Sequence, residues 1–374
     1  MTKNSTKKSK QGIHLLAKEA ANALKKAADG KDLNLGDLVA LLAVEGETKR
    51  QLFSLADETR AKYMGNQVHL RGIIEFSNYC VQNCLYCGLR KSNRKLFRYR
   101  MLPEEVLGIA KRAAQLGYRT IVLQSGEDPC YDAETLAELI GAIKKETGVA
   151  ITVSVGERRL EDYRLWREAG ADRYLLKHET ADPGLYVRLR PGHQLASRVK
   201  RLQWLRQLGY QIGSGNMVGL PGQTLETLAA DLILLKELDV EMAGLGPFVP
   251  HGDTPLAGAR AGNVDLNLKV LAVARLVLPW AHLPATTSIG TLDPQGRQKA
   301  LRVGANVVMP NVTPARYREH YQIYPGKICL QEEPEHCRSC VEGWITAMGR
   351  EVACDYGHSP KPGDWTSVVP VKAG

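Results

Sequence analysis

Between residues 67 and 328 the sequence alternates short β-rich runs with helical segments, and this alternation constrains the fold more than any other feature. The strands that it predicts are 68–76, 120–124, 150–155, 173–176, 211–218, 242–248, 283–289 and 306–310. These runs lack polar alternation, as expected where both faces of a parallel sheet are buried. Periodicity alone also permits a doubly wound sheet. We predict an α/β protein with a complete (βα)8 TIM-type barrel, because candidate functional residues follow nearly every strand.

Four segments make up the chain in this interpretation. We expect a disordered basic tail at 1–10 and an N-terminal helical extension at 11–66, where apolar residues recur near a spacing of 3.6. The barrel occupies 67–328, and a C-terminal segment with an auxiliary metal site occupies 329–374. Within the barrel, Pro103 opens a helix and Asp132 caps the next one.

Composition limits the compartment and the partners. The formal net charge of the 374 residues is +10, but four of these charges lie in the basic tail and the rest are dispersed, so we expect no nucleic acid partner. No apolar run is long enough to span a membrane, and the N-terminus lacks the apolar region of a secretory signal. We therefore expect a cytoplasmic protein, whose clustered cysteines serve metal or redox chemistry rather than disulfides.

The first cysteine group directly follows the first predicted strand. Cys80, Cys84 and Cys87 give the spacing C-x3-C-x2-C, with the aromatic Tyr86 before the third cysteine. Three thiolates on one loop can hold three irons of a 4Fe–4S cluster and leave the fourth iron open for S-adenosylmethionine (SAM). A zinc site is the alternative, but it needs a fourth ligand, and the next cysteine is more than forty residues away.

Two glycine-containing segments also follow predicted strands. Ser125, Gly126, Glu127 and Asp128 form a turn that could receive the SAM ammonium group, although such residues also form ordinary turns. The segment 213–222 carries four glycines around Met217, where the backbone could approach the adenosine part of SAM.

Longer stretches of the sequence resemble one family within the radical SAM superfamily. The segments 77–101, LQSGEDP (123–129), AGADRYLLKHET (169–180), MVGLPGQT (217–224), GPFVPHGDTPLA (246–257), PATTSIGT (284–291), GANVVMPN (304–311) and YQIYPGKIC (321–329) look like the HydE maturases of FeFe-hydrogenases. The likeness covers about residues 50–345, whereas biotin synthase and methylornithine synthase resemble this chain less. The resemblance implies a radical SAM enzyme that processes a cysteine-bound iron carbonyl/cyanide complex.

The resemblance also implies partners and site residues. The organometallic substrate would come from HydG, the product would pass to the HydF scaffold, and a ferredoxin or flavodoxin would supply electrons. The residues implied to bind the cofactor are Gln124, Ser125, Glu179 and Arg198. Those implied to bind substrate are Thr152, Lys177, Met242, Thr286, Thr287, Met309, Tyr321 and Tyr324. Lys177 departs from the arginine of the relatives, which puts its contact in doubt because lysine lacks the bidentate fork.

The remaining cysteines are harder to interpret. Cys329, Cys337 and Cys340 form C-x7-C-x2-C, which suits an auxiliary 2Fe–2S or 4Fe–4S cluster, with zinc and His336 as an alternative. Cys130 reads as a small buried apolar residue, and Cys354 has no defined role. Two rival functions stay open, a HydE-like radical SAM mutase or lyase acting on an amino acid, and a non-catalytic iron–sulfur assembly scaffold.

Overall fold

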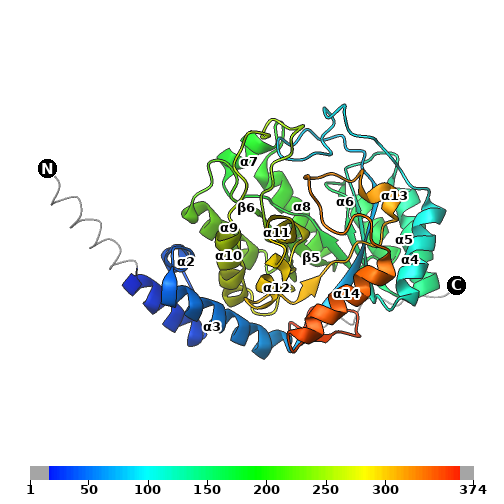
Figure 1. Ribbon diagram of the computed structural model, residues 1–374. Coiled ribbons are helices and arrows are strands. Elements are labelled where there is room, and N and C mark those ends of the chain that lie inside the picture. Colours follow the sequence, from blue (N-terminus) through cyan, green and yellow to red (C-terminus); the bar gives the residue numbers. More distant parts are fainter. Residues whose placement is uncertain (1–16, 363–374) are drawn as a thin grey trace.

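A parallel sheet forms the centre of the molecule, with helices around it (Figure 1). The computed structural model describes residues 17–362, so the predicted tail at 1–10 lies outside the described residues. Hydrogen-bonded neighbours run in the order β10–β1–β2–β3–β4–β5–β7, and β9 also pairs with β1. The strands are β1 (Gln67–Ser77), β2 (Thr120–Ser125), β3 (Ala150–Ser154), β4 (Arg173–Leu175), β5 (Gln211–Ser214), β7 (Met242–Ala243), β9 (Val307–Val308) and β10 (Glu351–Val352).

The region between β7 and β9 departs from the prediction. Within residues 17–362, no regular strand of the central sheet is assigned there, and two single parallel bridges, Met242 to His282 and Pro284 to Val307, join the chain to its neighbours. The predicted strand at 283–289 is wrong, because helix α11 (Thr287–Leu292) begins inside it. Its β-branched residues favour a strand locally, but strand preference depends on tertiary context. Two further short strands, β6 (Met217–Val218) and β8 (Gly246–Pro247), pair only with each other.

Helices cover the outer face of the sheet, and their ends follow the local signals in the sequence. Asp132 caps α5 by accepting a hydrogen bond from the Thr135 N–H at 2.8 Å, and Gly148 ends this helix with a φ of +64°. The helices are α4 (Pro103–Gln115), α5 (Ala133–Thr147), α6 (Leu160–Glu168), α7 (Pro183–Leu189), α8 (Leu195–Gln207), α9 (Leu225–Glu237), α10 (Val264–Val277), α11, α12 (Gly296–Leu301) and α13 (Ala315–Arg318). Within residues 17–362, no helix is both long and apolar enough to cross a bilayer.

The N-terminal part of the described residues is helical over residues 17–28, α2 (Leu35–Leu42) and α3 (Gly46–Met64). Helix α3 packs along α10, and α2 packs against α9 (Figure 1).

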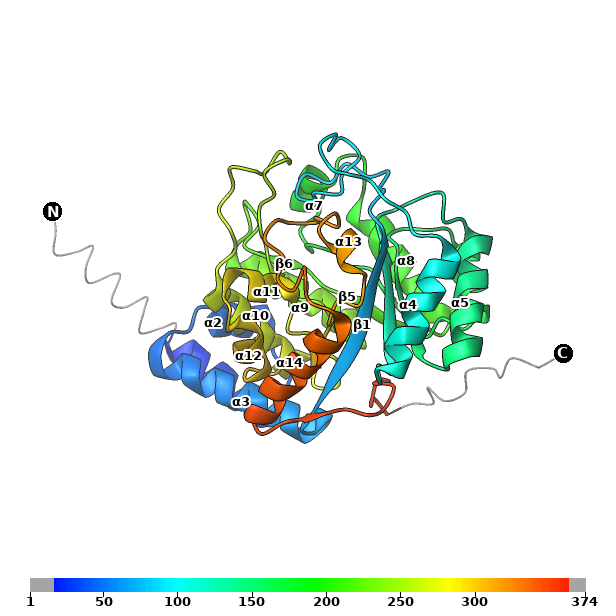
Figure 2. The ribbon, with the colours of Figure 1, turned by 45° about the vertical axis from the view of Figure 1, so that its right-hand side comes forward.

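The C-terminal region returns to the start of the sheet. After α14 (Pro334–Ala347), strand β10 pairs with Gln67 and Val68 at the beginning of β1. Residues 355–359, which we call the closing segment, then pass beneath the N-terminal ends of the strands (Figure 2). The Arg173 guanidinium and the Thr120 hydroxyl both donate to the Tyr356 carbonyl oxygen, at 2.6 and 2.9 Å. The C-terminal segment therefore adds a short strand beside β1 and covers the N-terminal ends of the strands.

Candidate functional site

The cysteine loop follows β1 directly and is fastened to the rest of the protein at three points. In each case the residue after a cysteine donates its backbone N–H to a different segment of the chain. These hydrogen bonds are Val81 N to Glu127 O (3.0 Å), Leu85 N to Leu189 O (2.9 Å) and Gly88 N to Ile323 O (3.0 Å). The loop after β2, the end of α7 and the C-terminal region thus hold the positions of the three cysteines together.

The three predicted cluster ligands lie close enough to affect one another. Cys84 is buried, and Cys80 and Cys87 are half-buried. Burial raises the pKa of Cys80 to about 11, and burial together with the neighbouring thiols raises the pKa of Cys87. Since thiolates are the ligands of iron, cluster binding must release these protons. Three thiols on one short loop fit three irons of a 4Fe–4S cluster, with the fourth iron left without a protein ligand.

The turn after β2 lies against the cysteine loop. A Cβ atom on Gly126 would collide with the Tyr79 carbonyl oxygen, so glycine is required for this close approach. Asp128 is fully buried and accepts hydrogen bonds from Arg100 and Ser77, each at 2.6 Å. Burial alone would raise the pKa of Asp128, but these hydrogen bonds lower it overall. The Asp128 carboxylate therefore holds the turn in place, and its predicted contact with SAM stays a prediction.

Buried guanidinium groups lie beside Cys84. The Arg198 Nε forms an ion pair with Glu157 at 2.8 Å and donates to the Tyr186 hydroxyl at 3.2 Å, but one terminal nitrogen of Arg198 has no hydrogen-bond partner. Arg190 lies 3.7 Å from Glu127, and its Nε and one terminal nitrogen also lack hydrogen-bond partners. Unpaired buried donors are costly, and a guanidinium fork matches a carboxylate. These two side chains fit the carboxylate of a ligand bound next to the cysteine loop.

Of these two, Arg190 was missed by the sequence analysis. It lies just after α7 in the run Arg188-Leu189-Arg190-Pro191, whose spacing carries no distinctive signal. Only the contact between α7 and the cysteine loop places it near Cys84.

Glu179 has an unusual backbone conformation that its surroundings maintain. Its φ is +68°, in the left-handed region that non-glycine residues rarely adopt. The fully buried Asp231 of α9 holds the residues on both sides, because it accepts hydrogen bonds from the Ala181 N–H and, at 2.7 Å, from the Asn216 amide. His178 Nε2 lies 3.4 Å from the same carboxylate. Asp231, another residue that the sequence analysis missed, therefore positions Glu179.

Two predicted residues of the barrel interior carry polar groups without partners. Thr152 is buried on β3, and its hydroxyl has no hydrogen-bond partner. Lys177 follows β4 and makes no hydrogen bond or ion pair to any described residue. Burial lowers the pKa of Lys177, while the nearby Glu179 opposes that change. Both groups are therefore available to a polar or anionic ligand.

The structure brings other predicted residues together in pairs. The Tyr321 hydroxyl lies near Gln124, and the Tyr324 hydroxyl lies near Thr287. The Thr286 and Ser288 hydroxyls are 3.1 Å apart.

The three methionines predicted to line the site lie in different surroundings. Met242 lies deeper in the barrel, within 2.8 Å of Arg71, whereas Met309 is half-buried near the strand end. Met217 and Tyr86 pack together against the small apolar cluster of Leu185, Leu189, Leu220 and Phe248.

A buried ion pair beside these residues gave no signal in the sequence. Glu75 on β1 accepts hydrogen bonds from Lys327 at 2.5 Å and from Asn311 at 2.8 Å. The three residues are far apart in the chain, and each is an unremarkable polar residue in its own segment. Only the closeness of β1 to the C-terminal region identifies them as one group.

The second cysteine group is less well assembled. The Cys329 and Cys337 thiols adjoin, which lowers the pKa of Cys329 to about 6, but Cys340 and His336 are exposed on α14. Within residues 17–362, no three His, Cys, Asp or Glu side chains are gathered as a single metal ion requires. Cys130 is exposed, so the interpretation of this residue as a buried apolar side chain is wrong.

Comparison with known proteins gives a family model, two similar curated proteins and a similar solved structure. A family model described as the radical SAM superfamily matches residues 74–235. The FeFe-hydrogenase maturase subunit HydE of Thermotoga maritima is 54% identical over 82% of this chain and 88% of its own length. The 3-methylornithine synthase of Methanosarcina barkeri is 33% identical over 88% of this chain and 93% of its own. The crystal structure of methylornithine synthase is similar with a TM-score of 0.79 and 30% identity, covering 88% of this chain and 97% of that chain.

Proposed function

The chain belongs to the HydE family of radical SAM enzymes, and from this premise we propose that it acts in assembling the di-iron subcluster of FeFe-hydrogenase. The observation that carries the proposal is the three-point fastening of the cysteine loop beside two guanidinium groups with unpaired donors. A 4Fe–4S cluster on these cysteines would, with SAM bound, supply a 5′-deoxyadenosyl radical.

Residues of this chain position the cofactors and shield them. Cys80, Cys84 and Cys87 would hold the cluster, and the unpaired donors of Arg190 and Arg198 would bind the SAM carboxylate. Glu179 would bind the sugar or the amino group, in the conformation that Asp231 maintains. Gln124, Ser125, Gly126, Glu127 and Met217 would complete the SAM contacts.

For the substrate, we infer a cysteine-bound iron carbonyl/cyanide complex supplied by HydG and passed on to HydF. Cyanide and carboxylate groups give such a complex negative charge. Lys177 and Thr152 support this assignment, because an ammonium and a hydroxyl without partners are available to an anionic ligand. Thr286, Thr287, Tyr321 and Tyr324 would contact the same ligand from the opposite wall, with Met242 and Met309 as apolar neighbours.

Four further points of organisation belong to the proposal. We infer that the barrel is closed, supported by the pairing of β9 with β1 and by the two single bridges on either side of residues 282–284. We propose the segment bounds 11–66, 67–328 and 329–374, supported by the end of α3, the start of β1 and the position of α14. A second iron–sulfur cluster would bind at Cys329, Cys337 and Cys340. We also infer a cytoplasmic location, because reducing conditions there keep cysteine thiols reduced and suit labile clusters.

The test of the enzyme assignment is SAM cleavage by the reconstituted protein with dithionite. We expect 5′-deoxyadenosine, and its absence would leave only the scaffold function. The maturase role is tested by omitting the protein from a cell-free hydrogenase maturation mixture. Active hydrogenase formed without it would refute that role.

One second candidate has support from the comparisons. The 33% identity and the fold shared with 3-methylornithine synthases favour a mutase or lyase acting on an amino acid. The higher identity to HydE, 54%, favours the maturase. Incubation of the reduced enzyme with free amino acids separates the two, because conversion of any of them by a SAM-dependent route would favour the mutase.

A further inference from the structure

Two segments of the chain that contain no acidic residue meet at the cysteine loop. Residues 78–102 and 183–225 contain no Asp or Glu, but together hold many Arg and Lys residues. The Leu85 N–H binds the Leu189 carbonyl oxygen at 2.9 Å, and Gln82 lies 2.6 Å from His193. Figure 2 shows the loop after β1 and helix α7 together beyond the C-terminal end of β1. Charges that look dispersed in the sequence are thus concentrated at one end of the barrel.

Several of these cations are exposed and have no ion pair within the described residues. Lys91, Arg94 and Arg188 are exposed, and none makes an ion pair with a residue of the described range 17–362. The acidic residues nearby do not offset them. Asp128 is buried and engaged by Arg100, and Asp253 pairs with Lys95 at 2.8 Å. Lys91 and Arg94 therefore carry uncompensated positive charge, whereas Asp182 at the start of α7 lies near Arg188.

Exposed apolar side chains lie on the same two segments. Val81, the residue after Cys80, is 48% exposed, and Phe97 is 65% exposed. Val187 on α7 is 39% exposed. Apolar contacts with a charged surround are typical of protein interfaces, and electron-transfer complexes use small ones. We call Lys91, Arg94, Arg188, Val81, Phe97 and Val187 the basic face.

We propose that the basic face docks a small acidic protein that carries one electron. The proposal rests on the proposed function, in which each cleavage of SAM consumes one electron. A cluster held by Cys80, Cys84 and Cys87 would accept one electron from the docked carrier, which would be oxidised by one, and would supply this electron for cleavage of the sulfur–carbon bond of SAM. Opposite charge steers the encounter, and Val81 places the carrier one residue from a cluster ligand.

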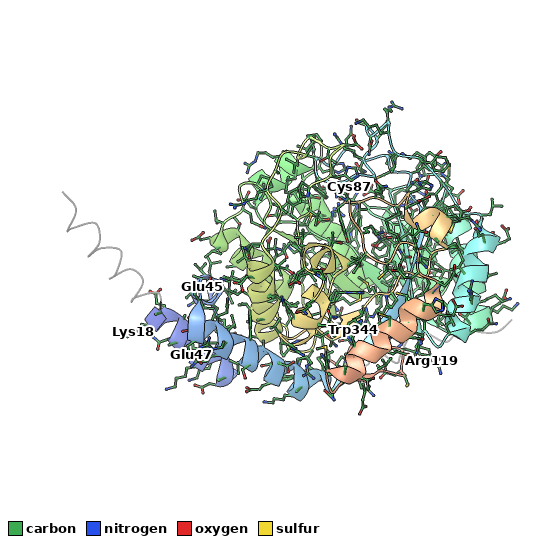
Figure 3. The ribbon with its side chains drawn as sticks, in the orientation of Figure 1. Lys18, Glu45, Glu47, Cys87, Arg119 and Trp344 are labelled. Carbon is green, nitrogen blue, oxygen red and sulfur yellow. The ribbon has the colours of Figure 1, made fainter. Side chains whose placement is uncertain are left out.

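Binding of a purified acidic flavodoxin tests the proposal without relying on turnover. The double variant Lys91→Glu/Arg94→Glu should weaken the Kd about tenfold or more and flatten its dependence on salt. The matched control is Lys18→Glu/Arg119→Glu, the same change of charge at exposed residues that lie away from Cys87 (Figure 3). The control should bind flavodoxin like the unaltered protein.

The chemical reductant separates this proposal from the proposed function. With dithionite, the Lys91→Glu/Arg94→Glu variant should cleave SAM at the unaltered rate, but with reduced flavodoxin it should be about tenfold slower at low salt. An unchanged Kd for flavodoxin in this variant overturns the docking proposal. The proposal also fails if the variant loses affinity for a DNA duplex but not for flavodoxin. Failure of the unaltered protein to cleave SAM with dithionite would instead overturn the proposed function. Should the double reversal fold poorly, Lys91→Gln/Arg94→Gln carries the binding test, with a Kd weakened about threefold expected.

Discussion

The two ends of the barrel bury polar side chains in opposite ways. At the C-terminal end of the strands, Thr152, Lys177, Arg190 and Arg198 have polar atoms without partners. At the N-terminal end, the closing segment supplies partners. Its His358 ring accepts hydrogen bonds from Arg173 at 3.0 Å and from Gln211 at 2.9 Å. Arg71 and Tyr118 at this end each keep one polar atom, the Nε and the hydroxyl oxygen, without a hydrogen-bond partner.

This difference distinguishes a candidate ligand-binding end of the sheet from an end whose polar groups stabilise the fold. Buried donors without hydrogen-bond partners reduce the stability of the fold, so we expect them where a bound ligand accepts their hydrogen bonds. Donors and acceptors that complete one another, as Arg173 and the closing segment do, stabilise the fold. Changes at the cluster end should therefore alter activity, and changes at the closed end should alter stability.

The largest effect is expected at the cysteine loop. Cys84→Ala should reduce SAM cleavage at least about 100-fold, because two thiolates cannot hold the cluster in its place. The measurement is 5′-deoxyadenosine formed with dithionite. Cys130→Ala, at an exposed cysteine outside both groups, should retain full activity. SAM cleavage by the Cys84→Ala variant at the normal rate would contradict the assignment of Cys84 as a cluster ligand.

Asp231→Asn tests positioning at the same end. Asparagine has the shape of aspartate but only one acceptor oxygen, whereas the Ala181 N–H and the Asn216 amide use both carboxylate oxygens of Asp231. Glu179 should therefore lose its left-handed backbone conformation. We expect the KM for SAM to rise about tenfold with a smaller change in kcat. Asp231→Glu should recover part of this loss, and Asp265→Asn on α10 is the matched control. Equal effects of the two Asn variants would show that Asp231 has no positioning role.

At the closed end, acid should reduce stability. Burial and the nearby Arg71 lower the pKa of His69 to about 4. Between pH 6.5 and 4 the unfolded chain binds a proton that the folded protein does not, so stability is complete above this window and falls with pH inside it. At pH 5 the loss from His69 is about 2 kcal/mol.

Thermal melts at pH 7.5 and pH 5 measure this loss. His69→Gln should reduce the difference between the two pH values, while SAM cleavage at pH 7.5 stays unchanged. A variant with the same pH dependence as the unaltered protein would mean that His69 is not the responsible group.

The smallest effect is expected at the second cysteine group, of which Cys337 and Cys340 lie on α14. Cys337→Ala should change SAM cleavage less than about twofold, because these thiols lie outside the barrel interior. Iron content should fall if a second cluster binds there. A tenfold loss of cleavage with unchanged iron at the first site would tie the second group to the reaction.

Regular elements were predicted well where local signals agree with the buried pattern. The strands at 68–76 and 120–124 and the cap at Asp132 lie where expected. The predicted strand at 283–289 failed because Thr286 and Thr287 favour β structure locally, while the packing of this segment begins a helix there. Local preference is weak compared with tertiary contacts, so such errors occur in short segments.

The site divides in a similar way. The spacing of Cys80, Cys84 and Cys87 within one loop determines the chemistry that they can perform, because thiolate ligands of one cluster must lie close together and the sequence places them so. Arg190, Asp231 and the pair of Glu75 with Lys327 could not be predicted, since each depends on contacts between distant segments.

By itself, the sequence determined the alternation of strands and helices, the cysteine loop and the family. The tertiary structure decided which buried donors lack partners, how the closing segment satisfies the other end, and where the basic residues gather. The physical reason is that periodicity and spacing act over a few residues. Burial, hydrogen bonding and surface charge depend on which segments meet, and the fold alone brings Leu85 to Leu189 and Glu75 to Lys327.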